Sequence, residues 1–191
     1  MDEREQTLTE VTEHVETVFR GPIFRVEVSE VRLPNGKTAR RDVVRHPGAV
    51  CVLPIDQNGR VYLVRQWRAG YRGTMLEIPA GKLDPGETDA EKAAERELRE
   101  ETGAVAARMT PLGDYYGSPA ILEERIAMYL AEDLTFGETD FDEDEFLAPV
   151  TMLLDELVRE VLAGHVPDGK TQVAALRAYC MRRGLPGDTE A

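Results

Sequence analysis

The feature that most constrains this chain is a glycine-bearing loop that leads directly into one short helix. The loop occupies residues 81–87, and the pattern that follows predicts a helix from about Asp89 to Thr102. Thr88, with Glu91 three positions later, is typical of a capping box at a helix start. Gly103 suits the left-handed residue that ends many helices. Strand-like segments flank this loop and helix, so the sequence favours a fold that packs helices on a sheet.

The end of this predicted helix carries three glutamates on one face. Glu97, Glu100 and Glu101 fall within roughly 100° of arc on a helix that advances about 100° per residue. They repel one another, and the helix dipole disfavours anions in the last turn by roughly 0.3 to 1 kcal/mol each. One interpretation is a solvated helix face with ion pairs between residues four apart. The other is a site for a hard divalent cation, Mg²⁺ or Mn²⁺, which prefers oxygen ligands.

Alternation of apolar and polar residues predicts a small antiparallel unit near the N-terminus. The dipeptide Asn35-Gly36 is a strong turn signal, and strands are expected around it at residues 14–19, 24–33 and 37–46. Two further apolar runs, 49–55 and 61–66, are separated by a short polar segment. We expect these two runs to pair as a second and more deeply buried hairpin.

Later residues mix strands with helices. Strands are expected at residues 110–116, 125–131 and near Met152, where Pro149 favours an edge position. Two closing helices are predicted at 155–163 and 170–183, each followed by a glycine. Strands and helices alternate without a repeating strand–helix–strand order, which predicts the α+β class.

Composition excludes several classes of function. The 191 residues carry a formal net charge of −13, which repels phosphate backbones and anionic lipids, so we expect no nucleic-acid partner and no membrane partner. No apolar run reaches the length of a membrane helix, and the polar start lacks a signal-peptide core, so we expect a cytoplasmic protein. Cys51 and Cys180 suit buried apolar positions better than a disulfide framework.

The loop and helix together resemble the Nudix box, G-x5-E-x7-R-E-U-x-E-E-x-G-U, in which U is aliphatic. The matching residues are Gly81, Glu87, Arg96, Glu97, Leu98, Glu100, Glu101, Gly103 and Ala104. Eight residues rather than seven separate Glu87 from Arg96, and the extra one falls where the loop enters the helix. Many fixed positions within a short stretch favour the metal-site interpretation over a solvated helix face.

The resemblance implies a Nudix fold, an α/β/α sandwich around a mixed sheet, that hydrolyses a nucleoside diphosphate linked to another group. It implies that Glu97, Glu100 and Glu101 bind Mg²⁺ or Mn²⁺, together with the carbonyl of Ala80. Such metal ions neutralise a diphosphate and lower the pKa of an attacking water. The resemblance further implies structural roles for the remaining box residues Gly81, Glu87, Arg96 and Gly103.

Outside the box, the chain resembles the ADP-ribose pyrophosphatase branch of this family. The matching stretches are Arg65-Gln66-Trp67-Arg68, Leu76 to Gly81, and Ser118 to Glu124, with Pro119 lying 15 residues beyond the box. This likeness implies cleavage of ADP-ribose to AMP and ribose 5-phosphate. It implies a substrate-binding set made of Arg65, Arg68, Glu77, Pro119 and Glu124.

The same branch suggests a partner and a general base. Its N-terminal strands are exchanged within a homodimer, which implies that Phe24 and Arg41 reach the partner's nucleotide. The acidic segment 141–146 resembles a loop that supplies a catalytic glutamate, so Glu143 and Glu145 are the candidate bases. Asp140, Asp142 and Asp144 are weaker candidates, and a solvated acidic loop is the alternative.

These features together predict three regions. They are an N-terminal strand unit at 1–46 that forms the dimer, a hydrolase domain at 47–185 and a tail at 186–191. Two alternatives to ADP-ribose hydrolysis stay open. One is the same chemistry on another nucleoside diphosphate sugar, and the other is a non-catalytic sensor that binds ADP-ribose to control a partner.

Overall fold

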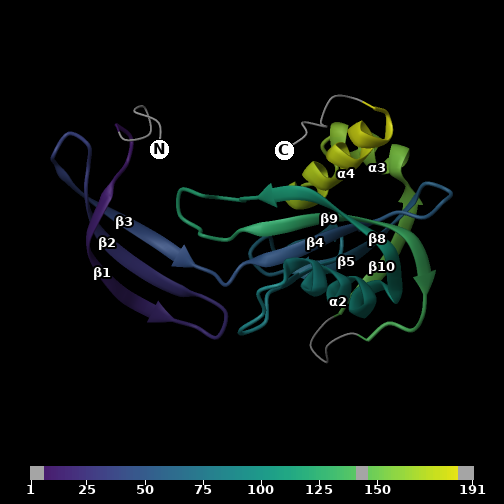
Figure 1. Ribbon diagram of the computed structural model, residues 1–191, viewed down its shortest axis with the longest axis horizontal. Helices are drawn as coiled ribbons and strands as arrows, with labels where there is room; N and C mark the ends of the chain where they lie inside the picture. Colours follow the sequence, from purple (N-terminus) through teal and green to yellow (C-terminus); the bar gives the residue numbers. More distant parts are fainter. Residues whose placement is uncertain (1–6, 141–145, 185–191) are drawn as a thin grey trace. The chain divides into compact units, whose positions relative to one another are not determined.

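A computed structural model describes residues 7–140 and 146–184, and their contacts divide the chain into two compact units (Figure 1). The N-terminal unit consists of Met1–Gly48 with Tyr116–Glu124. The core unit consists of Ala49–Tyr115 with Arg125–Ala191. Residues 116–124 therefore belong with the N-terminal strands, although half of the core unit lies between them in the sequence.

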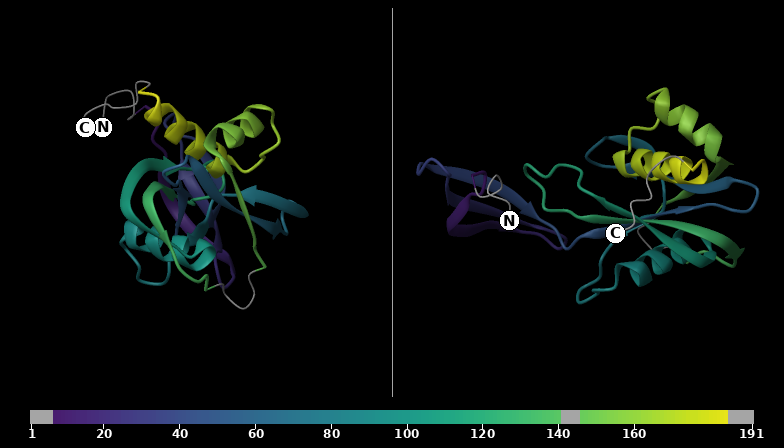
Figure 2. Two further views of the ribbon diagram at one scale, coloured as in Figure 1. Left: turned by 90° about the vertical axis from the view of Figure 1, so that its right-hand side faces the viewer. Right: turned by 45° about the horizontal axis from the view of Figure 1, so that its top comes forward.

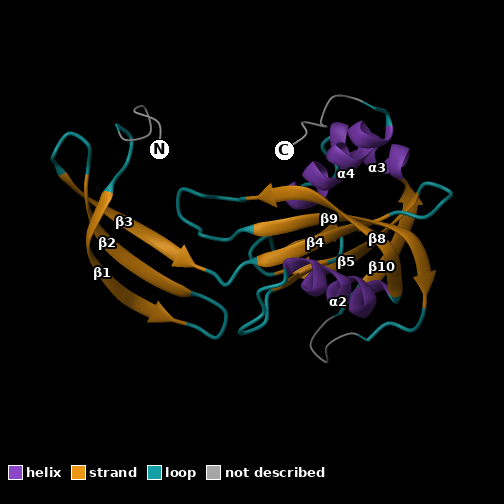
Figure 3. Cartoon of the chain, viewed as in Figure 1, coloured by secondary structure: helices purple, strands orange, loops and turns teal. Residues whose placement is uncertain are grey.

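An antiparallel sheet in the order β1-β2-β3 forms most of the N-terminal unit (Figure 3). Its strands are β1 (Val11–Arg20), β2 (Arg25–Arg32) and β3 (Thr38–Arg45). Gly36 turns the chain between β2 and β3 with a φ of 80°, the left-handed conformation that an Asn-Gly turn provides. The predicted antiparallel unit is confirmed.

The later segment of this unit, residues 116–124, is hydrogen-bonded to the end of β3. The Val44 amide donates to the Ile121 carbonyl at 2.8 Å, and the Glu123 amide donates to the Val44 carbonyl at 2.9 Å. Arg45 Nη1 also forms an ion pair with Glu123 Oε1 at 2.8 Å. Strand β3 thus holds residues 116–124 in place through its backbone. The sequence indicates only that this segment connects two predicted strands.

The core unit contains two sheets and three helices within its described residues. One sheet has the order β7-β4-β9-β8, from β4 (Ala49–Pro54), β7 (Ala80–Lys82), β8 (Ala104–Tyr115) and β9 (Ile126–Phe136). The other has the order β10-β5-β6, from β5 (Arg60–Arg68), β6 (Gly73–Glu77) and β10 (Ala148–Leu153). The helices are α2 (Ala90–Thr102), α3 (Leu154–Leu162) and α4 (Gly169–Arg182).

Helices cover both faces of the four-stranded sheet (Figure 2). Alternate β4 residues divide between the two faces, because side chains of a strand point to opposite sides. Val50 and Val52 pack in the cluster that includes α2, whereas Cys51 and Leu53 pack in the cluster that includes α3 and α4. β4 pairs with β9 in parallel and with β7 in antiparallel fashion, so the sheet is mixed. The predicted α+β Nudix fold, an α/β/α sandwich, is confirmed.

The predicted hairpin between β4 and β5 is wrong. The turn itself forms, since the Asp56 amide donates to the Arg60 carbonyl at 2.9 Å and Ile55 makes one bridge to Val61. Beyond this bridge the two strands enter different sheets. Both edges of β4 are occupied by β7 and β9, and both edges of β5 by β6 and β10. The turn therefore fixes only the residue pair next to it, and the further pairing of β4 is with strands elsewhere in the chain.

The start of α2 also differs from the prediction. Asp89, not Thr88, is the N-cap residue, and its carboxylate accepts a hydrogen bond from the Lys92 amide at 3.3 Å. A carboxylate at this position both satisfies a free amide and interacts favourably with the helix dipole. The predicted end is confirmed, because Gly103 terminates α2 with a φ of 69°.

The remaining elements follow the sequence closely. Strands β8 and β9 lie at the predicted positions but extend over 12 and 11 residues. Pro149 lies in β10, which is an edge strand as predicted. Cys51 and Cys180 are free thiols. Within the described ranges, no helix has the length and apolar character needed to cross a membrane.

Candidate active site

The last turns of α2 place the three glutamates of the box against the core rather than in bulk solvent. Glu97 and Glu101 are 8% and 1% exposed, and Glu100 is half-buried. A solvated helix face would leave all three carboxylates in water, so their burial contradicts that interpretation. Burial of charged carboxylates requires nearby cations.

Strand β7 approaches the Glu97 carboxylate closely. A Cβ atom on Gly81 would lie 1.9 Å from Glu97 Oε1 and 2.3 Å from Glu97 Oε2. Only glycine therefore fits at this position while the carboxylate keeps its place. Ala80 precedes it in β7, so its backbone belongs to the same edge of the sheet.

Arg96 supplies positive charge to this cluster. Its Nη1 donates to Glu97 Oε1 at 2.8 Å and to Glu100 Oε2 at 3.0 Å, and its Nη2 donates to Glu87 Oε2 at 3.2 Å. Despite the penalty of burial, the charge of Glu97 and the bonds to these carboxylates raise the pKa of Arg96. The pair between Glu87 and Arg96 forms even though one extra residue separates them. A turn precedes this pair in the loop, closed by the Glu87 amide donating to the Asp84 carbonyl at 2.9 Å.

The donor set fits a hard divalent cation in its chemistry. Glu97, Glu100, Glu101 and the Ala80 carbonyl offer only oxygen atoms, the ligands that Mg²⁺ and Mn²⁺ prefer. Across the described part of the chain, no three acidic, histidine or cysteine side chains are arranged as a complete ligand group. The Arg96 guanidinium instead bridges Glu97 and Glu100, and so a cation already joins two of these carboxylates.

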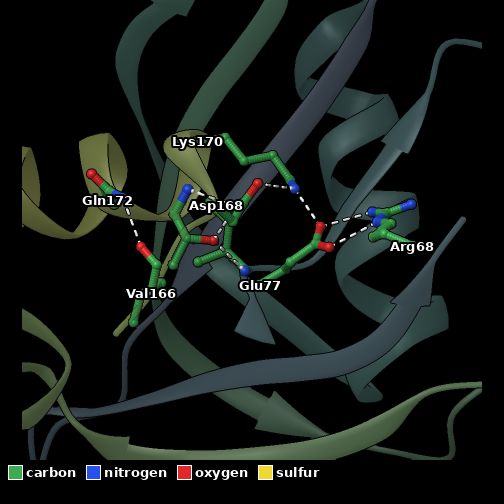
Figure 4. A network of polar contacts seen from close by, with 8 residues as sticks. Arg68, Glu77, Val166, Asp168, Lys170 and Gln172 are labelled. Carbon is green, nitrogen blue, oxygen red and sulfur yellow. Dashed lines mark hydrogen bonds and ion pairs between the residues drawn. The ribbon is translucent and has the colours of Figure 1, made fainter. Parts of the chain in front are cut away.

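A second charged cluster lies where β5 and β6 meet α4 (Figure 4). Arg68 donates from Nε and Nη2 to the two oxygens of Glu77, both at 2.7 Å. Lys170 Nζ donates to Glu77 Oε2 and, at 2.9 Å, to Asp168 Oδ1. The family resemblance implies a substrate-binding role for Arg68 and Glu77 but none for Lys170 or Asp168. The sequence signal that could have identified Asp168 was its position just before the predicted helix at 170–183, where aspartate is a common capping residue.

Burial and charge oppose each other in this cluster. Glu77 is 1% exposed and Lys170 is 8% exposed. Burial favours the neutral carboxyl group of Glu77, but the bonds from Arg68 and Lys170 outweigh it and hold its pKa below the ordinary value. Burial likewise disfavours the charged amine of Lys170, but Asp168 and Glu77 raise its pKa. Glu77 and Lys170 are therefore both ionised at neutral pH.

Arg65 and Trp67 lie on β5 with Arg68. Arg65 is exposed, and Trp67 is 63% exposed, so this single tryptophan is not a core residue of the core unit. The hydrogen bonds that Arg68 donates to Glu77 are the main reason that the pKa of Arg68 is raised, and the charges of Glu77, Asp168 and Glu101 add to the effect. The charge of Arg68 is thus felt at the carboxylate face of α2.

Three predicted substrate residues lie in the N-terminal unit. Arg41 is half-buried and donates from Nε to Glu10 Oε2 at 3.0 Å. Pro119 is exposed, and Glu124 Oε1 lies 3.5 Å from the Nδ1 of His46. Phe24, in the same unit, is 40% exposed.

The candidate bases Glu143 and Glu145 lie outside the described residues, as do Asp142 and Asp144. The amide of Asp140, immediately before that segment, donates to the Glu100 carbonyl at 3.0 Å. Asp140 is therefore hydrogen-bonded to the backbone of the last turn of α2.

Comparison with known proteins identifies the family. The NUDIX domain matches residues 44–176, which is most of the chain. The chain belongs to the Nudix family. It is 40% identical over 171 residues to a Bacillus subtilis protein named ADP-ribose pyrophosphatase, covering 88% of this chain and 92% of that protein.

Two further proteins resemble this Nudix chain. A Bacillus methanolicus protein named methanol dehydrogenase activator is 39% identical over 167 residues, covering 86% of this chain and 90% of that one. A crystal structure of an ADP compounds hydrolase superposes with a TM-score of 0.72 at 27% identity, covering 93% of this chain and 98% of that one. This chain is a Nudix pyrophosphatase that resembles ADP-ribose diphosphatases. Nudix enzymes generally use divalent metal ions.

Proposed function

We propose that this Nudix enzyme hydrolyses the diphosphate of ADP-ribose to AMP and ribose 5-phosphate. The observation that carries the proposal is the burial of Glu97 and Glu101 beside Gly81, on the same α2 face that Arg96 neutralises. Carboxylates placed in this way suit divalent cations that bind a diphosphate. The name of the Bacillus subtilis relative supports ADP-ribose as the substrate.

Charge explains why the site needs cations. The substrate diphosphate is an anion, and the chain has a net charge of −13. Mg²⁺ or Mn²⁺ held by Glu97, Glu100, Glu101 and the Ala80 carbonyl would neutralise the diphosphate and acidify a bound water. Arg65 and Arg68 would bind phosphate oxygens, as guanidinium groups do with bidentate geometry. Glu143 or Glu145 would take the proton of the attacking water.

The first test is a substitution on α2 with a control on the same helix. Glu101→Gln keeps the size of the side chain but removes its charge, so we expect kcat to fall by about 100-fold or more with the fold intact. Glu95→Gln makes the same chemical change at an exposed position of α2 and should match the wild-type enzyme. Unchanged turnover in Glu101→Gln would refute the metal assignment.

The second test distinguishes the substrates. Purified enzyme with Mg²⁺ is given ADP-ribose, GDP-mannose, UDP-glucose or flavin adenine dinucleotide, and the released monophosphate is measured. The highest kcat/KM with ADP-ribose supports the proposal, and a higher value with another compound assigns the same chemistry to that substrate. Reaction in oxygen-18 water identifies the attacked phosphorus from the labelled product.

A non-catalytic sensor is the alternative from another class. Its signature is tight binding of ADP-ribose with Mg²⁺ and no product. The name of the Bacillus methanolicus relative, an activator of an enzyme, makes this outcome worth measuring directly. Isothermal titration with ADP-ribose, followed by product analysis of the same sample, separates the sensor from the enzyme.

We also propose that the strand region at 1–46 forms a homodimer and that the hydrolase domain extends over 47–185. Strand β1 leaves Val11, Val15 and Val18 about half exposed, so apolar side chains of this strand are available to a second copy. Residues Arg41, Pro119 and Glu124 would then contribute to nucleotide binding. Sedimentation equilibrium of the full chain tests the dimer, and a monomer at all concentrations would refute it.

A further inference from the structure

The N-terminal turn of α4 holds a charged cluster that no part of the box explains (Figure 4). Lys170 Nζ donates to Glu77 Oε2 on β6 and to Asp168 Oδ1, the N-cap of α4. The second oxygen of Asp168 accepts the Thr171 amide at 3.0 Å and the Thr171 hydroxyl at 2.5 Å. Every oxygen of the two carboxylates in this cluster therefore accepts at least one hydrogen bond.

Arg68 is the one member of the cluster that reaches the surface. Its side chain is 42% exposed, whereas that of Glu77 is 1% exposed. Glu77 uses the Nε and Nη2 donors of the guanidinium. Within residues 7–140 and 146–184, the remaining Nη1 has no hydrogen-bond partner. One edge of Arg68 is thus fixed by Glu77, and the other is available to an anion.

The charges of the cluster balance. Lys170 and Arg68 supply two cations, and Glu77 and Asp168 supply two anions. Removal of one buried charge leaves another unpaired, which is costly in a weakly polar interior. Arg68 is the most exposed of the four, so it has the most freedom to move in response.

We infer that Lys170 and Asp168 are positioning residues, which hold Glu77 so that Arg68 presents Nη1 to a substrate phosphate. This inference rests on the part of the proposed function that places Arg68 against the substrate. Without Lys170, Asp168 and Glu77 leave a surplus negative charge that draws Arg68 inward, away from the substrate. Without the charge of Asp168, Lys170 binds Glu77 more strongly and competes with Arg68 for it.

A double-mutant cycle tests the inference through charge balance. Lys170→Met removes the cation at similar length, and Asp168→Asn removes the anion while keeping an N-cap residue. We expect Lys170→Met to raise KM by about tenfold and Asp168→Asn by about threefold, with kcat changed by less than about threefold. The double variant restores neutrality, and its KM should return to within about threefold of wild type. Lys37→Met, the same change at an exposed turn, is the control.

The dissociation constant of ADP-ribose, measured without metal for the same four proteins, provides a second double-mutant cycle that does not depend on turnover. A wild-type protein that binds ADP-ribose but still releases no product after Mg²⁺ is added would refute the proposed hydrolase and leave the positioning test in place. If another compound of the panel is the better substrate, the cycle is measured with that compound. Circular dichroism establishes whether each variant is folded. If Lys170→Met alone does not fold, the KM values of Asp168→Asn and of the double variant are compared instead.

Restoration of KM in the double variant supports the inference. If Lys170 only filled space, removing the charge of Asp168 would not compensate for its loss. The inference would be overturned if the fold-increase in KM of the double variant equals the product of the fold-increases of the two single variants. An unchanged KM in both single variants, or a loss of kcat at constant KM, would also overturn it.

Discussion

Replacing Gly81 by alanine would put a methyl group where the Glu97 carboxylate now lies. The added Cβ would be 1.9 Å from Glu97 Oε1, whereas ordinary contacts begin at 3.4 Å, so the oxygen must move by about 1.5 Å. The obstacle is the end of a flexible side chain rather than backbone, so the fold can accommodate the change. The cost falls on the position of the carboxylate.

That displacement breaks the hydrogen bond from Arg96 Nη1, which is 2.8 Å long in the wild-type protein. Loss of a hydrogen bond between charged groups costs about 1.5 to 3 kcal/mol. For a chain of this size, each kcal/mol lowers Tm by roughly 2 to 4 °C, which gives a decrease of roughly 3 to 12 °C. The effect on turnover is larger, because Glu97 leaves its place among the proposed ligands, and we expect kcat to fall by about 100-fold or more.

Thermal unfolding and steady-state hydrolysis, measured on the same preparation, compare the two effects. Gly70→Ala is the matched control, because its Cβ would meet no atom within 4 Å and its stability and turnover should not change. A folded Gly81→Ala variant that keeps more than half of the wild-type kcat would show that the Glu97 position is irrelevant to the reaction.

Three further predictions follow from the same structure. Gly103→Ala should lower stability more than Gly81→Ala does, because its Cβ would lie 2.5 Å from the Gly137 carbonyl at a φ of 69°; urea unfolding would measure this, and equal midpoints would contradict it. The pKa of Glu77 is lowered on folding, so the charged carboxylate stabilises the protein fully above its ordinary pKa of 4.5, and this stabilisation is lost as the pH falls through the folded pKa. The difference in unfolding free energy between wild type and Glu77→Gln should therefore shrink as the pH is lowered below 4.5. A difference that stays constant with pH would refute the linkage. Burial raises the pKa of Cys51 to about 12, so a thiol reagent at pH 8 should modify only Cys180 in the native protein, and two rapid equivalents would contradict the burial of Cys51.

Local sequence signals predicted the elements well and their partners less well. The Asn35-Gly36 turn and the Gly103 stop depend on φ values that glycine adopts easily, so the sequence alone reveals them. The pairing of β4 depends on residues more than 70 positions later in β9, and a turn signal at 56–59 carries no information about them. The predicted N-cap of α2 was wrong by one residue, because Thr88 and Asp89 are adjacent and both are common capping residue types.

The candidate site shows the same division. The spacing of the box placed its glutamates on one face of α2, because helix geometry is regular over short distances. Lys170 could not be predicted from spacing, since it meets Glu77 only after α4 packs against the sheet. Its apolar stem and charged end would suit a surface position equally well, so only the buried partners distinguish its role.

The ion pair between Glu77 and Lys170 joins residues 93 positions apart. During synthesis on a ribosome, the box emerges long before the first turn of α4, so the carboxylates of α2 are present before Lys170 can reach Glu77. Contacts of such long range form late in folding. If Lys170 positions Arg68 as proposed, the contribution of Arg68 to nucleotide binding is one of the last features of the site to form, because it requires α4 to dock.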